Sequence, residues 1–174
     1  MFTDVHSFSI AMVDLGLQRS YRFVQALYET IGESVIPRSG EILKYIGDGV
    51  IVLFGEGDAV DAIRCAKEMR EKFATLAAQW ELPPETELEV GISAGEIGIG
   101  LFGHESLVQR DAFGEAINEA AMIGHHRGVA IAEPVRRLLN NEFILNPLPD
   151  ANLKWRSSPL QVWEIEGEAI ESEK

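Results

Sequence analysis

The stretch Glu41-Ile42-Leu43-Lys44-Tyr45-Ile46-Gly47-Asp48-Gly49-Val50-Ile51-Val52-Leu53-Phe54 decides how this chain folds. Its apolar residues form two runs, one ending at Ile46 and one extending from Val50 to Phe54. The Gly-Asp-Gly between them suits the positive φ of a tight turn, so the stretch predicts a β-hairpin. Asp48 then lies at the tip of the ribbon. An aspartate there is ordinary turn chemistry unless other residues converge on it.

Two amphipathic helices are predicted on either side of the hairpin. Apolar residues recur at three- and four-residue intervals from Gln18 to Val35 and again from Val60 to Leu76. Further along, residues 88–92 and 97–102 predict two strands joined around Gly95 as a second hairpin, with a polar loop over residues 104–112. A short helix and several brief strands follow. This order predicts an α+β domain with a mostly antiparallel sheet and helices packed on it.

Length and charge narrow the function classes. The chain has 174 residues, which suits one domain, and a net charge of −13, which disfavours nucleic acid or an anionic membrane as partner. No apolar run reaches the roughly 18 residues of a membrane span, and the start does not resemble a signal peptide. The single cysteine, Cys65, excludes an internal disulfide and suits a packed small residue. We therefore expect a cytoplasmic domain without direct membrane insertion.

Asp4 and Asp48 form the candidate chemical centre. Asp4 ends the first predicted strand, and the hairpin that carries Asp48 can lie beside that strand. Two carboxylates meeting there can hold a pair of divalent ions, and oxygen ligands favour Mg²⁺ or Mn²⁺. The amides that follow Asp4 at a helix start suit a phosphate. Only three residues precede Asp4, which favours a domain trimmed at its N-terminus.

The motifs, taken in order, resemble the class III adenylate/guanylate cyclase catalytic domain. They are Phe2-Thr3-Asp4-Val5-His6-Ser7-Phe8-Ser9, Lys44-Tyr45-Ile46-Gly47-Asp48, Val90-Gly91-Ile92-Ser93-Ala94-Gly95-Glu96, Asp111-Ala112-Phe113-Gly114-Glu115-Ala116-Ile117-Asn118, and the closing Leu153-Lys154-Trp155-Arg156 with Pro159-Leu160-Gln161-Val162-Trp163. Each motif alone is weak, but their order and spacing together are specific. The resemblance implies a ferredoxin-like sheet, a catalytic domain over residues 1–167, and an acidic tail over 168–174 that we expect to be disordered.

The resemblance also implies a role for each matching residue. Asp4 and Asp48 match the ligands of two Mg²⁺ or Mn²⁺ ions, and the turn of Val5, His6, Ser7 and Phe8 matches the triphosphate site. Lys44 and Asp111 match the purine-reading pair. A lysine can donate to adenine N1 and an aspartate can accept from the 6-amino group, so the pair suits ATP. Glutamate and cysteine are typical at these positions in guanylate cyclases. Asn118 matches the ribose-orienting asparagine.

The implied reaction is attack of the ribose 3′-hydroxyl on the α-phosphate, which yields 3′,5′-cyclic AMP and pyrophosphate. In this family each site combines residues of two subunits. The resemblance therefore implies a head-to-tail homodimer with interfacial sites, and a regulatory domain on a longer chain is compatible with it.

One position departs from the family pattern. Four residues after Asn118 the family has an arginine that stabilises the transition state, whereas this chain has Met122. Arg127, beside His125 and His126, is a candidate substitute. The alternative is that these three residues form a solvated helix end, where positive charge complements the helix dipole.

Three function classes remain open on the sequence. The first is an adenylate cyclase domain, the second a degenerate cyclase-homology domain that binds nucleotide or a partner without efficient catalysis, and the third a purely structural dimerisation module. A diguanylate cyclase is disfavoured, because Gly47-Asp48-Gly49-Val50 does not match the Gly-Gly-Asp/Glu-Glu-Phe turn of those enzymes.

Overall fold

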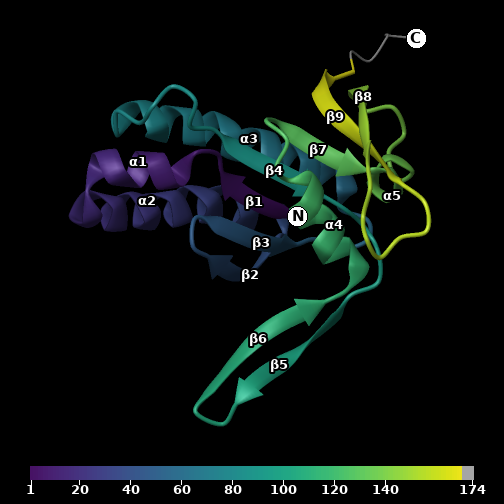
Figure 1. The fold of residues 1–174 in the computed structure, drawn as a ribbon. Coiled ribbons are helices and arrows are strands. Elements are labelled where there is room, and N and C mark those ends of the chain that lie inside the picture. The colour runs from purple at the N-terminus through teal and green to yellow at the C-terminus, as the bar shows by residue number, and fades with distance from the viewer. Residues whose placement is uncertain (170–174) are drawn as a thin grey trace.

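A sheet of seven strands supports the rest of the chain (Figure 1). The computed structural model describes residues 1–169. The strand order across the sheet is β2-β3-β1-β4-β7-β9-β8, and every neighbouring pair is antiparallel except β4 with β7. The strands are β1 (Phe2–Val5), β2 (Glu41–Ile46), β3 (Gly49–Leu53), β4 (Leu88–Ile92), β7 (Val129–Ala132), β8 (Phe143–Ala151) and β9 (Leu160–Glu168). The predicted α+β class with a mostly antiparallel sheet is confirmed.

The first hairpin is the predicted one. Ile46 pairs with Gly49, which leaves Gly47 and Asp48 as a two-residue turn. Gly47 has a φ of 63°, the positive value that a short hairpin turn needs and that glycine adopts without strain. A shift in register between Ile42 and Lys44 interrupts the pairing of β2 with β3. Such a bulge changes the direction of the side chains that follow it.

Helices α1 (Phe8–Leu15), α2 (Leu17–Val35) and α3 (Ala59–Gln79) pack beside the sheet, and the 3₁₀ turn η1 (Ile36–Arg38) follows α2 (Figure 1). Their apolar stripes are buried together with strand residues: Phe23, Leu27 and Ile63 have no exposed surface. Both predicted amphipathic helices are confirmed. Among the described residues, no helix combines the length and the apolarity needed to span a bilayer.

Helix α4 (Glu115–Ile123) rests directly on β4, β7 and β1, and the short α5 (Glu133–Arg136) follows β7. Two glycines permit the close approach of α4. A Cβ on Gly91 would lie 2.0 Å from the carbonyl oxygen of Ala120 and 2.6 Å from the amide nitrogen of Gly124. The C-terminal end of α4 is therefore fixed against β4, and with it the position of the residues that follow Gly124.

The second hairpin differs from the prediction. Strand β4 pairs with β1 and β7, and the hairpin is formed instead by β5 (Gly98–His104) and β6 (Leu107–Phe113), which make a separate two-stranded sheet. The expected polar loop over residues 104–112 was thus wrong, since most of it is β6. The hairpin extends away from the main sheet like an arm (Figure 1).

Strand β9 extends one residue into the expected acidic tail. Glu168, which we expected to begin the acidic tail, ends β9, and its carboxylate accepts a hydrogen bond from Arg64 at 3.0 Å. Residues 170–174 of the expected tail lie outside the described residues.

Candidate active site

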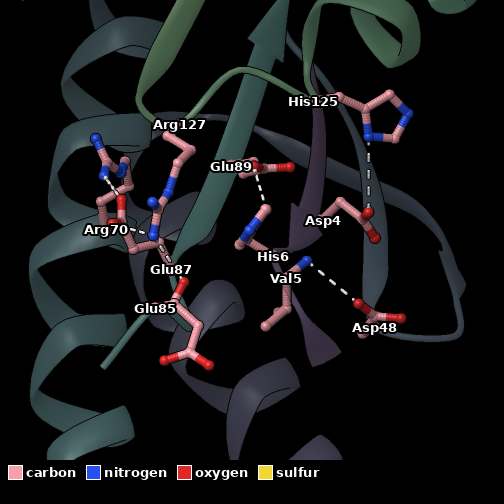
Figure 2. A network of polar contacts seen from close by, with 10 residues as sticks. All are labelled: Asp4, Val5, His6, Asp48, Arg70, Glu85, Glu87, Glu89, His125 and Arg127. Atoms are coloured by element: carbon pink, nitrogen blue, oxygen red, sulfur yellow. Dashed lines mark hydrogen bonds and ion pairs between the residues drawn. The ribbon is translucent and has the colours of Figure 1, made fainter. Parts of the chain in front are cut away.

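Asp4 and Asp48 meet where the end of β1 adjoins the tip of the β2–β3 hairpin (Figure 2). The amide of Val5 donates a hydrogen bond to Oδ2 of Asp48 at 3.2 Å, which holds the turn against β1. Burial, and after it the charge of Asp4, raise the pKa of Asp48 to about 6. A buried carboxylate next to a second aspartate fits a divalent cation, because a cation would offset the cost of holding the Asp48 charge there.

The turn after Asp4 supplies free amides. Ser7 has a φ of 59°, a left-handed conformation that is uncommon outside glycine, and α1 starts at the next residue. The amide of His6 donates to the carbonyl of Glu87 at 2.8 Å. In the part of the chain that the structure describes, the amides of Ser7 and Phe8 donate no hydrogen bond. They remain available to an anion at the N-terminus of the helix.

Lys44 and Asp111 are in contact although 67 residues separate them in the sequence. Nζ of Lys44 donates to Oδ2 of Asp111 at 2.7 Å, and this hydrogen bond holds the pKa of Asp111 below its usual value. Both side chains are partly exposed. The arm formed by β5 and β6 brings Asp111 to β2. The structure therefore joins Lys44 and Asp111, the two positions that the resemblance assigns to purine recognition, into one polar pair.

Asn118 and Met122 lie one turn apart on the exposed face of α4. Met122 is 51% exposed, and the side chain of Asn118 makes no hydrogen bond among the described residues. Between them, Glu119 points inward: it accepts a hydrogen bond from Oγ of Ser93 at 2.6 Å and pairs with Arg156. The buried ion pair anchors the helix that presents Asn118.

Arg127, the candidate substitute for the missing arginine, is engaged elsewhere (Figure 2). Its guanidinium lies 3.0 Å from the Glu87 carboxylate, which also pairs with Arg70, and it donates to the carbonyl of Glu85 at 3.0 Å. Arg127 must leave these partners before it can act beside Asn118.

The sequence did not predict several residues that support the site. The Tyr28 hydroxyl donates to the carbonyl of Gly47, and its ring stacks on Tyr45 with centroids 3.9 Å apart, so α2 supports the turn that carries Asp48. Nothing in the sequence links Tyr28 to that turn, since it fits the apolar stripe of its helix. Glu89 did leave a signal, because it interrupts an otherwise apolar strand.

The mostly antiparallel sheet with helices packed on it is the fold of solved cyclase catalytic domains. The model of the family described as "Adenylate and Guanylate cyclase catalytic domain" matches residues 1–167, so the chain belongs to this family.

Relatives agree with this membership. The chain is 22% identical over 176 residues to the terminal-differentiation specific adenylate cyclase of Dictyostelium discoideum, a match that covers 94% of this chain and 8% of that protein. It is 23% identical over 129 residues to an adenylate cyclase of Anabaena cylindrica, covering 71% of this chain and 26% of that protein. The chain thus spans about a quarter or less of the length of these curated relatives.

Solved structures share the fold. The adenylyl cyclase CyaB from P. aeruginosa superposes with a TM-score of 0.86 at 21% identity, covering 94% of this chain and 90% of that one. The guanylyl cyclase Cya2 superposes with a TM-score of 0.85 at 19% identity, covering 98% and 92%. Because both specificities occur among these neighbours, the fold alone does not select ATP or GTP.

Proposed function

We propose that this domain is an adenylate cyclase that converts ATP to 3′,5′-cyclic AMP and pyrophosphate. The observation that carries the proposal is the contact between Lys44 and Asp111 at 2.7 Å. A cation and a carboxylate side by side offer one donor and one acceptor, as the N1 and 6-amino groups of adenine require. Guanine presents a donor at N1 and an acceptor at O6, so the same pair would suit it only in reversed order.

Each other site residue has a defined task in this reaction. Asp4 and Asp48 hold Mg²⁺ or Mn²⁺, two ions per site. Bound there, such ions lower the pKa of the ribose 3′-hydroxyl and neutralise phosphate charge. In the turn from Val5 to Phe8, the amides of Val5 and His6 already donate within the chain, so the free amides of Ser7 and Phe8 bind the triphosphate. Asn118 orients the ribose.

A head-to-tail homodimer completes the site in this proposal. Lys44 and Asp48 lie on one hairpin, but within one chain Lys44 contacts Asp111 whereas Asp48 contacts Val5. Two separate half-sites on one ribbon are the arrangement expected if each serves a different interfacial site. The exposed apolar side chains of the β5–β6 arm support an interface: Ile99, Leu101, Phe102, Leu107, Val108 and Phe113.

The direct experiment measures cyclic AMP formation from ATP with Mn²⁺ in a protein verified as a dimer. We expect turnover that Asp48→Ala abolishes. We expect Lys44→Ala to lower kcat/KM for ATP by about 10- to 100-fold, since one hydrogen bond to substrate is worth about 1.4–2.8 kcal/mol here, and to leave kcat/KM for GTP little changed. A dimer without Asp48-dependent turnover would refute the proposal.

A second candidate rests on Met122. A degenerate domain that binds ATP without efficient catalysis is favoured by a methionine, 51% exposed, at the position of the transition-state arginine. Losing such a cation lowers rates by orders of magnitude. A rise of about tenfold or more in kcat for Met122→Arg would identify weakened catalysis, whereas ATP binding without turnover in both proteins would establish the binding domain.

We place the activity in the cytoplasm, where ATP is available and a free thiol such as Cys65 stays reduced. The greater length of the curated relatives supports control by a regulatory domain.

A further inference from the structure

Glu89 is a buried carboxylate that the proposed reaction does not use. Its side chain is 3% exposed, and it lies directly opposite Asp4 in the pairing of β4 with β1. Like charges directly opposite each other on neighbouring strands destabilise a sheet. A buried carboxylate in such a place requires a partner that compensates its charge.

His6 compensates the charge of Glu89 only in part. Nδ1 of His6 lies 2.9 Å from Oε1 of Glu89, a distance that permits an ion pair when the imidazole is protonated. Yet Oε1 has no hydrogen-bond partner of acceptable geometry among the described residues. A short distance alone does not satisfy a buried oxygen, because a hydrogen bond also needs a favourable angle. Oε1 of Glu89 is therefore buried beside His6 without a well-directed hydrogen bond.

A third potential ligand reaches the same space. His125 follows the glycine at the end of α4, and the close contact of Gly124 with Gly91 fixes this segment over β4. Nδ1 of His125 lies 4.0 Å from Oδ2 of Asp4, too far for a hydrogen bond. One ligand atom each from Asp4, Glu89 and His125 lie within 4.8 Å of one another (Figure 2).

We propose that Asp4, Glu89 and His125 form a binding site for a first-row transition metal ion such as Mn²⁺ or Zn²⁺, and that it fills without nucleotide. Ligand atoms about 2.1 Å from one ion are roughly 3–4 Å apart, so ligand atoms that now lie up to 4.8 Å apart must approach by no more than about 2 Å. The His125 side chain, 63% exposed, is free to make that movement. Two carboxylates balance a divalent charge.

The imidazole determines which metals fit. Mn²⁺ and Zn²⁺ accept nitrogen and carboxylate oxygen together, whereas Mg²⁺ prefers an all-oxygen shell. This site differs from the pair of Asp4 with Asp48, because it lies on the β4 side of β1 and contains no residue of the hairpin. Asp4 is shared, so an ion bound to Glu89 and His125 competes for one ligand of the proposed catalytic ions.

Calorimetric titration of nucleotide-free protein at pH 7.5 with Zn²⁺, Mn²⁺ and Mg²⁺ tests the site. We expect one Zn²⁺ per chain, with an affinity that falls at least tenfold in His125→Ala. Asp48→Asn, which removes the hairpin ligand only, and His104→Ala, which removes an exposed histidine of the arm, should keep the affinity within about threefold. Mg²⁺ affinity should not respond to His125→Ala.

Pulsed electron paramagnetic resonance of bound Mn²⁺ provides the second measurement. We expect ¹⁴N coupling in the wild type and its loss in His125→Ala, a surface change that leaves the fold intact. Unchanged Zn²⁺ affinity in His125→Ala, or loss of binding in Asp48→Asn, would overturn the proposal. Cyclase turnover has no part in either readout, so an inactive protein that binds Zn²⁺ through His125 would refute the proposed function and support this site.

Discussion

The single residue Asp48 lowers the stability of the metal-free protein at neutral pH. Its pKa is raised to about 6 from an ordinary value of 3.8, so the folded state binds a proton more tightly than the unfolded chain does. The stability gained from that proton is fully present below pH 3.8 and is lost as the pH rises through 6. At neutral pH the carboxylate therefore destabilises the metal-free protein.

Asp48→Asn should consequently stabilise the metal-free protein at pH 7.5. A shift of this size corresponds to less than roughly 3 kcal/mol. Solvent screening of a partly exposed group reduces the expected gain in the free energy of unfolding to about 1 kcal/mol. The amide oxygen of asparagine still accepts the bond from Val5. Urea unfolding in EDTA measures the change, and an equal gain at pH 4 would contradict the titration argument.

At the scale of elements, α4 depends on a buried ion pair. Glu119 is almost fully buried and pairs with Arg156, whose side chain is 29% exposed. Removing one partner of such a pair leaves an uncompensated charge, which typically costs 3–5 kcal/mol. We therefore expect Arg156→Met to lower the free energy of unfolding by about 3 kcal/mol.

The double variant Glu119→Met/Arg156→Met should lose less, because no charge remains buried. Arg137→Met is the matched control: this arginine pairs with Glu133 but is 72% exposed, so the loss should stay below about 1 kcal/mol. Urea unfolding followed by circular dichroism distinguishes them. Equal losses in the single and double variants would show that packing, not charge, explains the effect.

The sequence predicted individual turns and helices, but it did not predict which strands pair with each other. The turn at Gly47 and the stripe of α2 depend on neighbouring residues, and both were predicted with correct boundaries within a residue or two. The pairing of β4 depends on segments far along the chain, so the glycine-rich residues beyond it suggested the wrong hairpin. The sequence likewise did not predict that Asp4 lies opposite Glu89, because this depends on the register between β1 and β4.

For the site residues, spacing within ordered motifs allowed Asp4, Asp48, Lys44 and Asp111 to be proposed together. Which of these side chains contact each other could be seen only in the folded structure. The contact of Lys44 with Asp111 depends on the arm that the sequence reading mistook for a loop. The sequence thus indicated which residues have side chains suited to chemistry, whereas the fold showed which of these side chains lie together.

In the whole molecule, the β5–β6 arm exposes apolar side chains that a single chain does not cover. Leu101 and Val108 are exposed on one side of the ribbon, and Phe102, Leu107 and Phe113 are exposed on the other. A two-stranded hairpin is marginally stable alone in water. Apolar side chains on both of its faces indicate that another surface covers them, as the proposed homodimer would.

Leu101→Asp should therefore convert the dimer to a monomer without unfolding it, because this side chain is 73% exposed in the single chain. Burying a carboxylate in an apolar interface is strongly unfavourable. Sedimentation equilibrium should show dissociation, and cyclic AMP synthesis should fall by about 100-fold or more. Ile36→Asp, at a position 67% exposed in η1 and away from the arm, is the control and should remain dimeric and active. A Leu101→Asp protein that stays dimeric would place the interface on another surface.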